Sequence, residues 1–273
     1  MKNKTYLNII ALIFTITLFI KAKPLIAFGF IIIYMIVINY PTILYYIAIN
    51  KYSNKQLEDA NKYFEKMNRC FYTPTKLKIS YVYYLLLQEQ IEKAEKQIKS
   101  IPKKEIKESN KIDFGLNYSL VMWKKNDINK AIEILMNIYT NNKNTLIYQN
   151  LGYFLILKGD YKAALEFNLE AFDYNSSNSG IMDNLAQTYY YLEEYGKAIG
   201  IFEEVISKKP TFATPYYYYA LTLIKKNNKE KALAILKMGL DCKFSPLSIT
   251  SKKDLETKII ELEPATELLT TIN

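Results

Sequence analysis

Histidine is absent from the 273-residue sequence, which removes the side chain most often used as a general base or metal ligand. Cysteine occurs twice, at Cys70 and Cys242, far apart and without a CxxC pair. A zinc site or a disulfide framework is therefore not supported. We expect two buried, reduced thiols that act as small hydrophobic side chains.

Glycine is also scarce, and the eight glycines are scattered rather than gathered into a phosphate-binding loop. Acidic pairs such as Glu193/Glu194 and Glu203/Glu204 fit a turn and an outer helix face, where solvation explains them. No pattern pairs a nucleophile with a base. The sequence therefore predicts a protein that is not an enzyme, with no catalytic, cofactor-binding or metal-binding residues and no small-molecule substrate.

The formal charge of +9 is spread unevenly. Residues 1–50 carry four lysines and no acidic side chain, whereas the remaining residues carry 32 basic and 27 acidic side chains. No stripe of arginine or lysine concentrates this mild excess. Nucleic-acid binding is therefore not expected.

Two uncharged apolar runs open the chain, Thr5–Ile20 and Leu25–Asn50, joined by "KAKP". The second run has 26 residues, enough to cross a hydrocarbon core of ~30 Å, and the first has 16, with lysines at both ends that can reach the interface. We predict a transmembrane hairpin over residues 1–50, with spans at about 5–20 and 25–48. The alternative is one span that follows a cleaved signal peptide or an interfacial segment.

Flanking charge predicts the orientation of this hairpin. Seven basic residues lie on the side shared by its two ends, against two in its turn. By the positive-inside rule, the protein is expected in the cell membrane with two spans and with the bulk of the chain in the cytoplasm.

A repeat of about 34 residues occupies the rest of the chain. Its marker is an alanine, and the successive intervals are 34, 37, 33, 34 and 34 residues, for Ala60, Ala94, Ala131, Ala164, Ala198 and Ala232. Each unit reads as a helix, a short polar turn such as "KGD" or "KNN", and a second amphipathic helix. A small side chain recurs because two helices must cross closely there, and units that cannot bury their apolar faces alone must stack.

These units resemble the tetratricopeptide repeat (TPR). The unit Thr145–Asn178 carries "LG" at Leu151 and Gly152 and "GDY" at 159–161, and the next unit carries Ala198, Phe202 and a closing Pro210. The resemblance implies an all-α fold, a TPR-type helix-turn-helix solenoid with a right-handed superhelix, preceded by two transmembrane helices. We expect the solenoid over 51–246 and a C-terminal capping helix in 247–273; the solenoid comprises a half repeat at 51–72 and repeats at about 75–108, 112–144, 145–178, 179–212 and 213–246.

The half repeat lacks a first helix of its own. Its helix around Ala60 is expected to pair with the end of the second span, near Pro41–Lys51, with no flexible linker between them. The solenoid would then begin directly on the membrane helix.

In the TPR family, the first helices of successive units line a concave groove that binds peptides. Carried over by register, the groove candidates of this chain are Asn117, Trp123, Gln149, Asn150, Tyr153, Asp183, Asn184, Gln187, Tyr190, Tyr191 and Tyr217. The basic positions of the family's carboxylate clamp hold Leu146, Gly180, Thr214 and Tyr218 here, so binding of chaperone tails is not supported.

Two questions about this groove stay open in the sequence. Asn117, Asn150 and Asn184 share one repeat position. An asparagine there either binds the backbone of a peptide ligand or has only a structural role within the fold. The aromatic candidates suit a protein interface, yet the chain has 25 tyrosines in all, so composition alone can supply them.

Within the run Tyr216–Tyr219, the register places Tyr216 and Tyr219 in the core, Tyr217 in the groove and Tyr218 at its border. The resulting hypothesis is a membrane-anchored, non-enzymatic scaffold that binds a protein or peptide partner in its groove. The alternative is a structural subunit of a membrane protein assembly that associates through its spans or solenoid ends.

Overall fold

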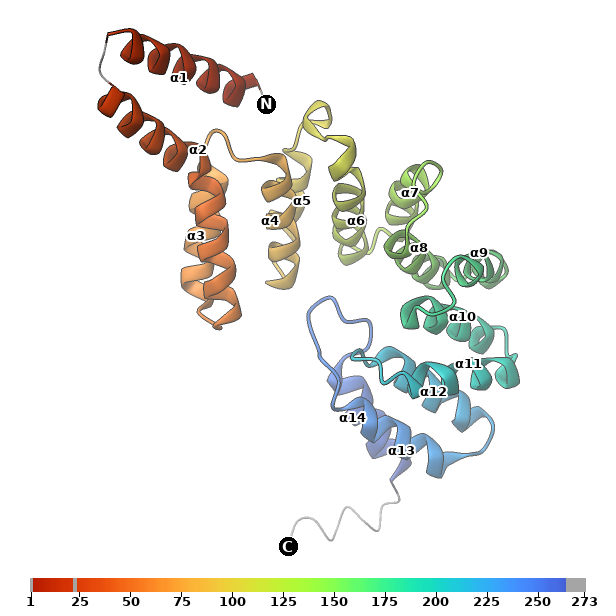
Figure 1. Cartoon of the computed structure of the whole chain (residues 1–273). Coiled ribbons are helices and arrows are strands. Elements are labelled where there is room, and N and C mark those ends of the chain that lie inside the picture. Colours follow the sequence, from red (N-terminus) through yellow and green to blue (C-terminus); the bar gives the residue numbers. More distant parts are fainter. Residues whose placement is uncertain (1, 22–23, 264–273) are drawn as a thin grey trace, which may run out of the picture. The chain divides into compact units, whose positions relative to one another are not determined.

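The computed structural model describes residues 2–21 and 24–263, and all the regular structure in this part is helical (Figure 1). Its elements are α1 (Lys2–Ile20), α2 (Pro24–Ser53), α3 (Leu57–Arg69), α4 (Thr75–Leu87), α5 (Ile91–Lys99), a short 3-10 helix (Lys103–Glu105), α6 (Glu108–Lys124), α7 (Ile128–Tyr139), α8 (Thr145–Lys158), α9 (Tyr161–Tyr174), α10 (Ser179–Tyr191), α11 (Tyr195–Ser207), α12 (Thr214–Lys225), α13 (Lys229–Gly239) and α14 (Lys252–Leu262).

The turns between paired helices share one backbone feature. A residue with left-handed backbone occurs in each, with φ between 55° and 84°, at Lys55, Glu89, Asn126, Gly159, Glu193 and Asn227. Each lies five residues before an alanine of the 34-residue pattern, and all six alanines are fully buried. The repeat predicted from the alanines is thus confirmed by an independent property of the backbone.

Gly152 shows why a small residue is needed where paired helices cross. It lies on α8, and a Cβ atom at this position would come within 2.0 Å of the Asn168 Oδ1 atom on α9. Any larger residue would therefore push the two helices apart.

The chain divides into two compact units, which are described separately. The N-terminal unit contains Met1–Leu85 and Glu92–Phe114, and the C-terminal unit contains Leu86–Ile91 and the residues from Gly115 onward. The division runs through α6, inside the region predicted as one solenoid. The predicted domain and repeat boundaries stay predictions.

In the N-terminal unit, α2 serves two roles along its length. Its first half exposes large apolar side chains, among them Leu25 at 85% and Ile33 at 62%. Its second half packs against α3 through a buried stripe at helical spacing: Ile38, Pro41, Leu44 and Ala48. The predicted pairing of the Ala60 helix with the end of the second apolar run is confirmed, so the last part of the predicted span also forms the first helix of a pair.

Only α2 is long and apolar enough to cross a membrane among the described residues. The apolar stretch Tyr6–Ile20 of α1 is shorter. It packs against α2, with the Phe14 and Phe30 rings 4.7 Å apart. The second predicted span therefore has a matching helix, and the first stays a prediction.

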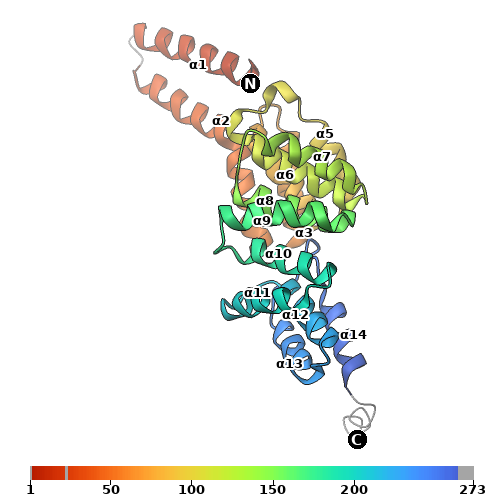
Figure 2. The same cartoon turned by 90° about the vertical axis from the view of Figure 1, so that its right-hand side faces the viewer.

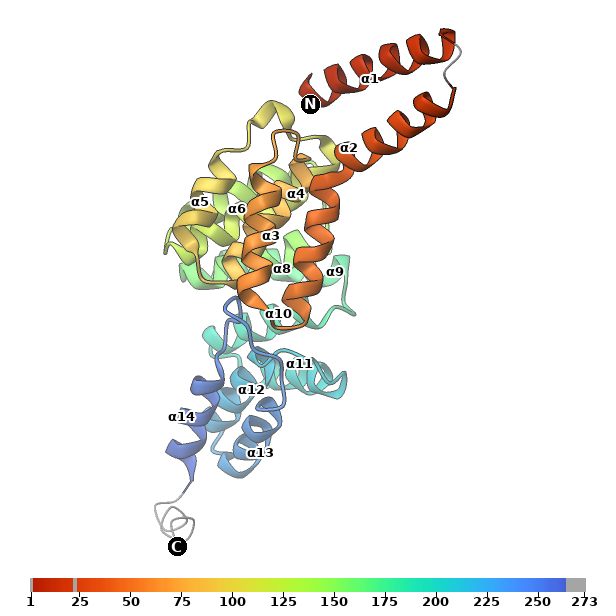
Figure 3. The same ribbon diagram turned by 90° about the vertical axis from the view of Figure 1, so that its left-hand side faces the viewer.

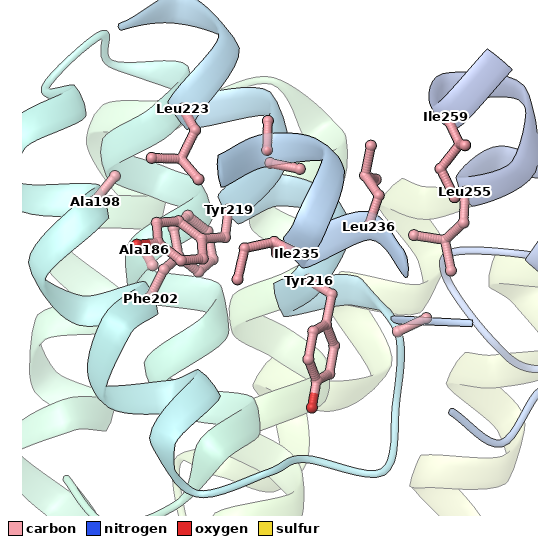
Figure 4. Packing of buried hydrophobic residues seen from close by; sticks show 13 residues of the cluster. Ala186, Ala198, Phe202, Tyr216, Tyr219, Leu223, Ile235, Leu236, Leu255 and Ile259 are labelled. Atoms are coloured by element: carbon pink, nitrogen blue, oxygen red, sulfur yellow. The ribbon is translucent and has the colours of Figure 1, made fainter. Parts of the chain in front are cut away.

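In the C-terminal unit, helices α8 to α13 follow one another as stacked pairs (Figures 1 and 2). Figure 4 shows the core of the last pairs, where Phe202 of α11 and Tyr219 of α12 stack with ring centroids 5.8 Å apart. Leu255 and Ile259 of α14 close this core, and a capping box formed by Ser251 and Asp254 starts the helix. The C-terminal capping helix thus begins at Lys252, after a loop that occupies the first residues of the predicted cap.

Candidate functional site

The first helices of three successive pairs in the C-terminal unit, α8, α10 and α12, contact one another directly. This stacking brings together several predicted groove residues: Tyr153 of α8 and Asp183, Tyr190 and Tyr191 of α10. A side chain outside the predicted set, Tyr218 of α12, completes this tyrosine–aspartate cluster. These residues of neighbouring helices, 27 to 30 positions apart in the chain, lie close to one another.

Tyr218 is held by contacts to two neighbours. Its hydroxyl lies 2.8 Å from the Tyr191 hydroxyl, and its ring lies 5.7 Å from the Tyr190 ring. Tyr161, also outside the predicted set, stacks on Tyr191 at 4.7 Å from α9. The sequence signal for Tyr218 was its place at the groove border; Tyr161 belongs to a turn motif and gave no signal of a groove role.

Asp183 is the acidic member of the cluster, and it is almost completely buried at 2% exposure. Its Oδ1 atom has no hydrogen-bond partner among the described residues. Burial raises the pKa of this carboxyl well above its usual range, because the charged form loses solvation, and the nearby Gln187 side chain partly opposes this rise. Gln187, one turn further along α10, is also fully buried, and both polar atoms of its amide lack a partner in the described part of the chain.

A cavity of about 70 Å³ lies beside Asp183. Its lining residues come from α8, α10 and two loops: Gln149, Asn150, Tyr153, Gly180, Asp183, Asn184, Phe212 and Ile249. Gly180, at a clamp position of the family, contributes no side chain here; a Cβ atom there would come within 2.4 Å of the Gln149 side chain.

The loop between α13 and α14 returns to α8 and α10, the first helices of two successive pairs (Figure 3). Its Ile249 lines the small cavity, and its residues from Lys243 to Thr250 line a second cavity of about 290 Å³ together with Gln149 of α8. Backbone pairing of Lys243 N with Thr211 O at 2.9 Å fixes the start of this loop. The repeat pattern ends before this loop, so sequence reasoning missed it.

The asparagines of the predicted groove are used inside the fold. Asn184 donates to the Gln149 carbonyl at 2.7 Å, which ties α10 to α8, and Asn150 donates to the Leu146 carbonyl of its own helix at 2.8 Å. For these two residues the contacts support the structural alternative. Asn117 lies half-buried on α6.

The remaining aromatic candidates lie at the two sides of the cluster. Trp123 of α6 meets the Tyr153 ring edge-on at 6.1 Å and carries the Lys124 ammonium 4.5 Å above its own ring. Tyr217 meets the Tyr218 ring edge-on at 5.6 Å. Burial raises the pKa of Tyr217, and charged side chains of α14, beginning with Lys258, lie close enough to modify it. Tyr217 thus adjoins the capping helix.

The described residues contain no group of three or more acidic or cysteine side chains that could hold a metal ion. Both cysteines are unpaired, but they are half-buried rather than buried as expected. Cys242 lies in the loop after α13, where it packs against the edge of the core of the last pairs, and Cys70 directly follows α3. Burial raises the pKa of both thiols, which disfavours the reactive thiolate.

Comparison with known proteins agrees with this architecture. The family model "Tetratricopeptide repeat" matches residues 180–209, which cover nearly all of α10 and α11. No curated protein sequence matches the chain.

Solved structures share the fold at low sequence identity. A TPR protein from Parabacteroides merdae is 11% identical, with 92% of this chain and 96% of that chain covered and a TM-score of 0.68. A thermophilic TPR protein from Thermus thermophilus is 14% identical over 68% of this chain and 96% of that chain, with a TM-score of 0.55. PilF from Pseudomonas aeruginosa is 16% identical over 68% and 82%, with a TM-score of 0.52. The chain has the all-helical fold of a tetratricopeptide-repeat solenoid.

Proposed function

We propose that the protein is a membrane-anchored, non-enzymatic scaffold that binds a protein or peptide partner on the surface formed by α8, α10 and α12. The observation that carries this proposal is the tyrosine–aspartate cluster, in which the buried Tyr153 and three half-buried tyrosines lie near a carboxyl oxygen without a partner in the described residues. Tyrosine is enriched at protein interfaces because its ring is apolar and its hydroxyl forms hydrogen bonds.

The membrane part of the proposal rests on α1 and α2. The exposed side chains of α2 are apolar from Leu25 to Val37, a stretch that rises about 20 Å, and its outer face continues with Tyr46. Phe71, 72% exposed, adjoins Tyr72, whose hydroxyl donates to the Val37 carbonyl at 2.6 Å. Aromatic side chains favour the membrane–water boundary, so we place the cytoplasmic boundary at the level of Val37 and Phe71.

The binding surface is tested by crosslinking from native membranes followed by identification of the captured protein. We expect the Tyr153→Ala plus Tyr190→Ala variant to lose the captured protein, because it removes one ring from each of two adjacent helices. Tyr174→Ala is the matched control, since Tyr174 ends α9 and is 48% exposed outside the cluster. Equal capture by the wild type and the double variant would contradict the proposal.

Orientation is tested by protease protection. In sealed right-side-out vesicles, residues 51–273 should be protected, because the predicted topology places them inside. Digestion of this region in intact vesicles would refute the cytoplasmic location.

The competing hypothesis, a structural subunit of a membrane assembly, predicts a different particle mass. In lipid nanodiscs the scaffold should contain one copy of the chain. A larger assembly that persists in the Tyr153→Ala plus Tyr190→Ala variant would favour the subunit hypothesis.

A further inference from the structure

Three polar atoms without partners gather one turn apart on α10. They are Oδ1 of Asp183 and both amide atoms of Gln187, and none has a hydrogen-bond partner in the described part of the chain. Both side chains are at least 98% buried. Of these two residues only Asp183 lines a cavity, and native proteins rarely leave such a buried acceptor unpaired, so its Oδ1 atom is open to a donor from outside the described residues.

The cavity beside Asp183 has the size and charge to admit a small cationic group. At about 70 Å³ it exceeds what one water molecule needs. Asp183 provides the one carboxyl in its lining, which contains no lysine or arginine. The Asn184 amide already donates to the Gln149 backbone carbonyl, so the Oδ1 atom of Asp183 is the acidic acceptor that the wall leaves unpaired. A donor with positive charge matches this wall.

Aromatic side chains add a second attraction for a cation. Tyr153 lines the cavity, and Tyr191 and Tyr218 lie next to it. A cation near tyrosine ring faces is attracted by the negative face of each ring, most strongly where water is excluded. The combination of a buried carboxyl with neighbouring phenol rings therefore suits a guanidinium or ammonium group.

We propose that this cavity, the Asp183 pocket, receives the charged end of an arginine or lysine side chain of the partner. This inference rests on the proposed function, which supplies the protein or peptide partner. It adds that the partner carries an arginine or lysine side chain at this position. The carboxylate of Asp183 accepts the N–H donors of the basic side chain, and Tyr153 packs along it. Ile249, from the loop after α13, forms the outer wall. The competing occupant is a set of ordered water molecules, which the experiment below separates.

A probe without a peptide sequence tests the pocket directly. Nα-acetyl-arginine N-methylamide and the corresponding lysine and citrulline compounds are titrated into the full chain in detergent micelles. Citrulline has nearly the shape of arginine but no charge. The single tryptophan, Trp123, lies 6.1 Å from the Tyr153 ring and reports binding through its fluorescence.

We expect saturable binding of the arginine or lysine probe that is at least tenfold tighter than binding of the citrulline probe. Asp183→Asn, which keeps the shape of the side chain, should weaken binding of the basic probe at least tenfold. Asp173→Asn, an exposed carboxyl on α9, is the matched control and should bind as the wild type does. Ile249→Phe should also abolish binding, because it fills the pocket from the loop without changing α10.

Binding of the basic probe should strengthen as the pH rises from 5 to 8. The cation favours ionised Asp183, whose pKa burial raises, so a proton is released on binding. The titratable groups that face it are Tyr153 and Tyr218, whose pKa values are also raised by burial, together with Tyr191. Lys243 lines the adjoining larger cavity. Asp183→Asn should remove the pH dependence.

Several results would overturn the inference. The inference fails if the arginine and citrulline probes bind equally, if neither basic probe binds, or if Asp183→Asn binds as the wild type does. Each result would favour ordered water as the occupant of the pocket. A peptide library screened on the full chain separates this inference from the proposed function. Enriched peptides without a basic residue would refute the pocket and leave the groove; probe binding with no enriched peptide would support the pocket and refute the peptide groove.

Discussion

Helix α2 of the N-terminal unit and helix α14 of the C-terminal unit have outer faces of opposite character. At the C-terminal end, α14 buries Leu255 and Ile259 and turns charged residues such as Lys252, Glu256 and Glu261 outward. At the N-terminal end, α2 buries a stripe against α3 while its other face exposes Ile, Phe and Tyr side chains.

Repeat arrays need terminal elements whose outer face is polar, because that face meets water. The helix α14 satisfies this requirement and α2 does not. The outer face of α2 is therefore not the polar, water-facing surface of a capping helix. An exposed apolar face of this length is unfavourable in water and favourable in lipid. The packing of α2 therefore supports the membrane proposal in addition to the hydrophobic run in the sequence.

The largest expected effect comes from adding charge to the outer face of α2. Ile32→Lys plus Ile36→Lys places two lysines on one exposed helix face, and each costs about 3 kcal/mol near the centre of a bilayer. We expect most of the variant to be released from membranes by alkaline carbonate, whereas the wild type stays bound. Ile260→Lys on α14, at a site 57% exposed, is the control and should change nothing. Release of the wild type as well would show that the exposed apolar face of α2 does not hold the protein in the membrane.

The two ends should also differ in how far a core defect spreads. Phe64 of α3 is fully buried and stacks on Tyr84 at 4.0 Å and on Tyr81 at 5.8 Å. Phe64→Ala should cost about 3–5 kcal/mol and speed hydrogen exchange in α2, α3 and α4 together. Leu255→Ala should speed exchange mainly in α14, because this helix packs on one side only. An equal spread of exchange in the two variants would contradict this distinction.

A single hydroxyl links α2 to the loop before α4. Pro41 has no N–H, so the Val37 carbonyl lacks its helical partner and accepts the Tyr72 hydroxyl at 2.6 Å instead. Tyr72→Phe should cost about 1 kcal/mol, measured by thermal unfolding in micelles. In a Pro41→Ala background the helix satisfies this carbonyl itself, and the same substitution should cost almost nothing. Additive effects of the two changes would show that the hydroxyl bond does not stabilise this junction.

The repeat register was predictable because it depends on short-range features of the sequence. The alanine spacing places the helix crossings, and the short turns between them carry the left-handed residues from Lys55 to Asn227. The same register correctly divided Tyr216–Tyr219, since Tyr216 and Tyr219 are 5% and 1% exposed and the two between are half-buried.

The Asp183 pocket was only partly predictable. The register placed Asp183 and Tyr153 on neighbouring helices, but the cavity beside the carboxyl is also lined by Ile249, which returns from a loop with no repeat signal. Non-local contacts of this kind leave no periodic trace in a sequence. The cysteines were predicted as buried because cysteine usually is; the loop and helix-end positions that leave them half-exposed depend on the same non-local packing.

The smallest expected effect compares the first and last turns of the repeat array. Lys55 and Asn227 have φ values of 61° and 60°, a conformation that costs a side chain such as lysine about 1–2 kcal/mol but that asparagine tolerates. Glycine relieves this strain and adds about 0.5–1 kcal/mol of chain entropy to the unfolded state. Lys55→Gly should therefore stabilise the fold by roughly 0.5 kcal/mol, whereas Asn227→Gly should be neutral or slightly destabilising. Thermal unfolding of both variants in the same micelles measures this, and a loss of stability in Lys55→Gly would mean that the first turn is not held in the conformation that the other turns share.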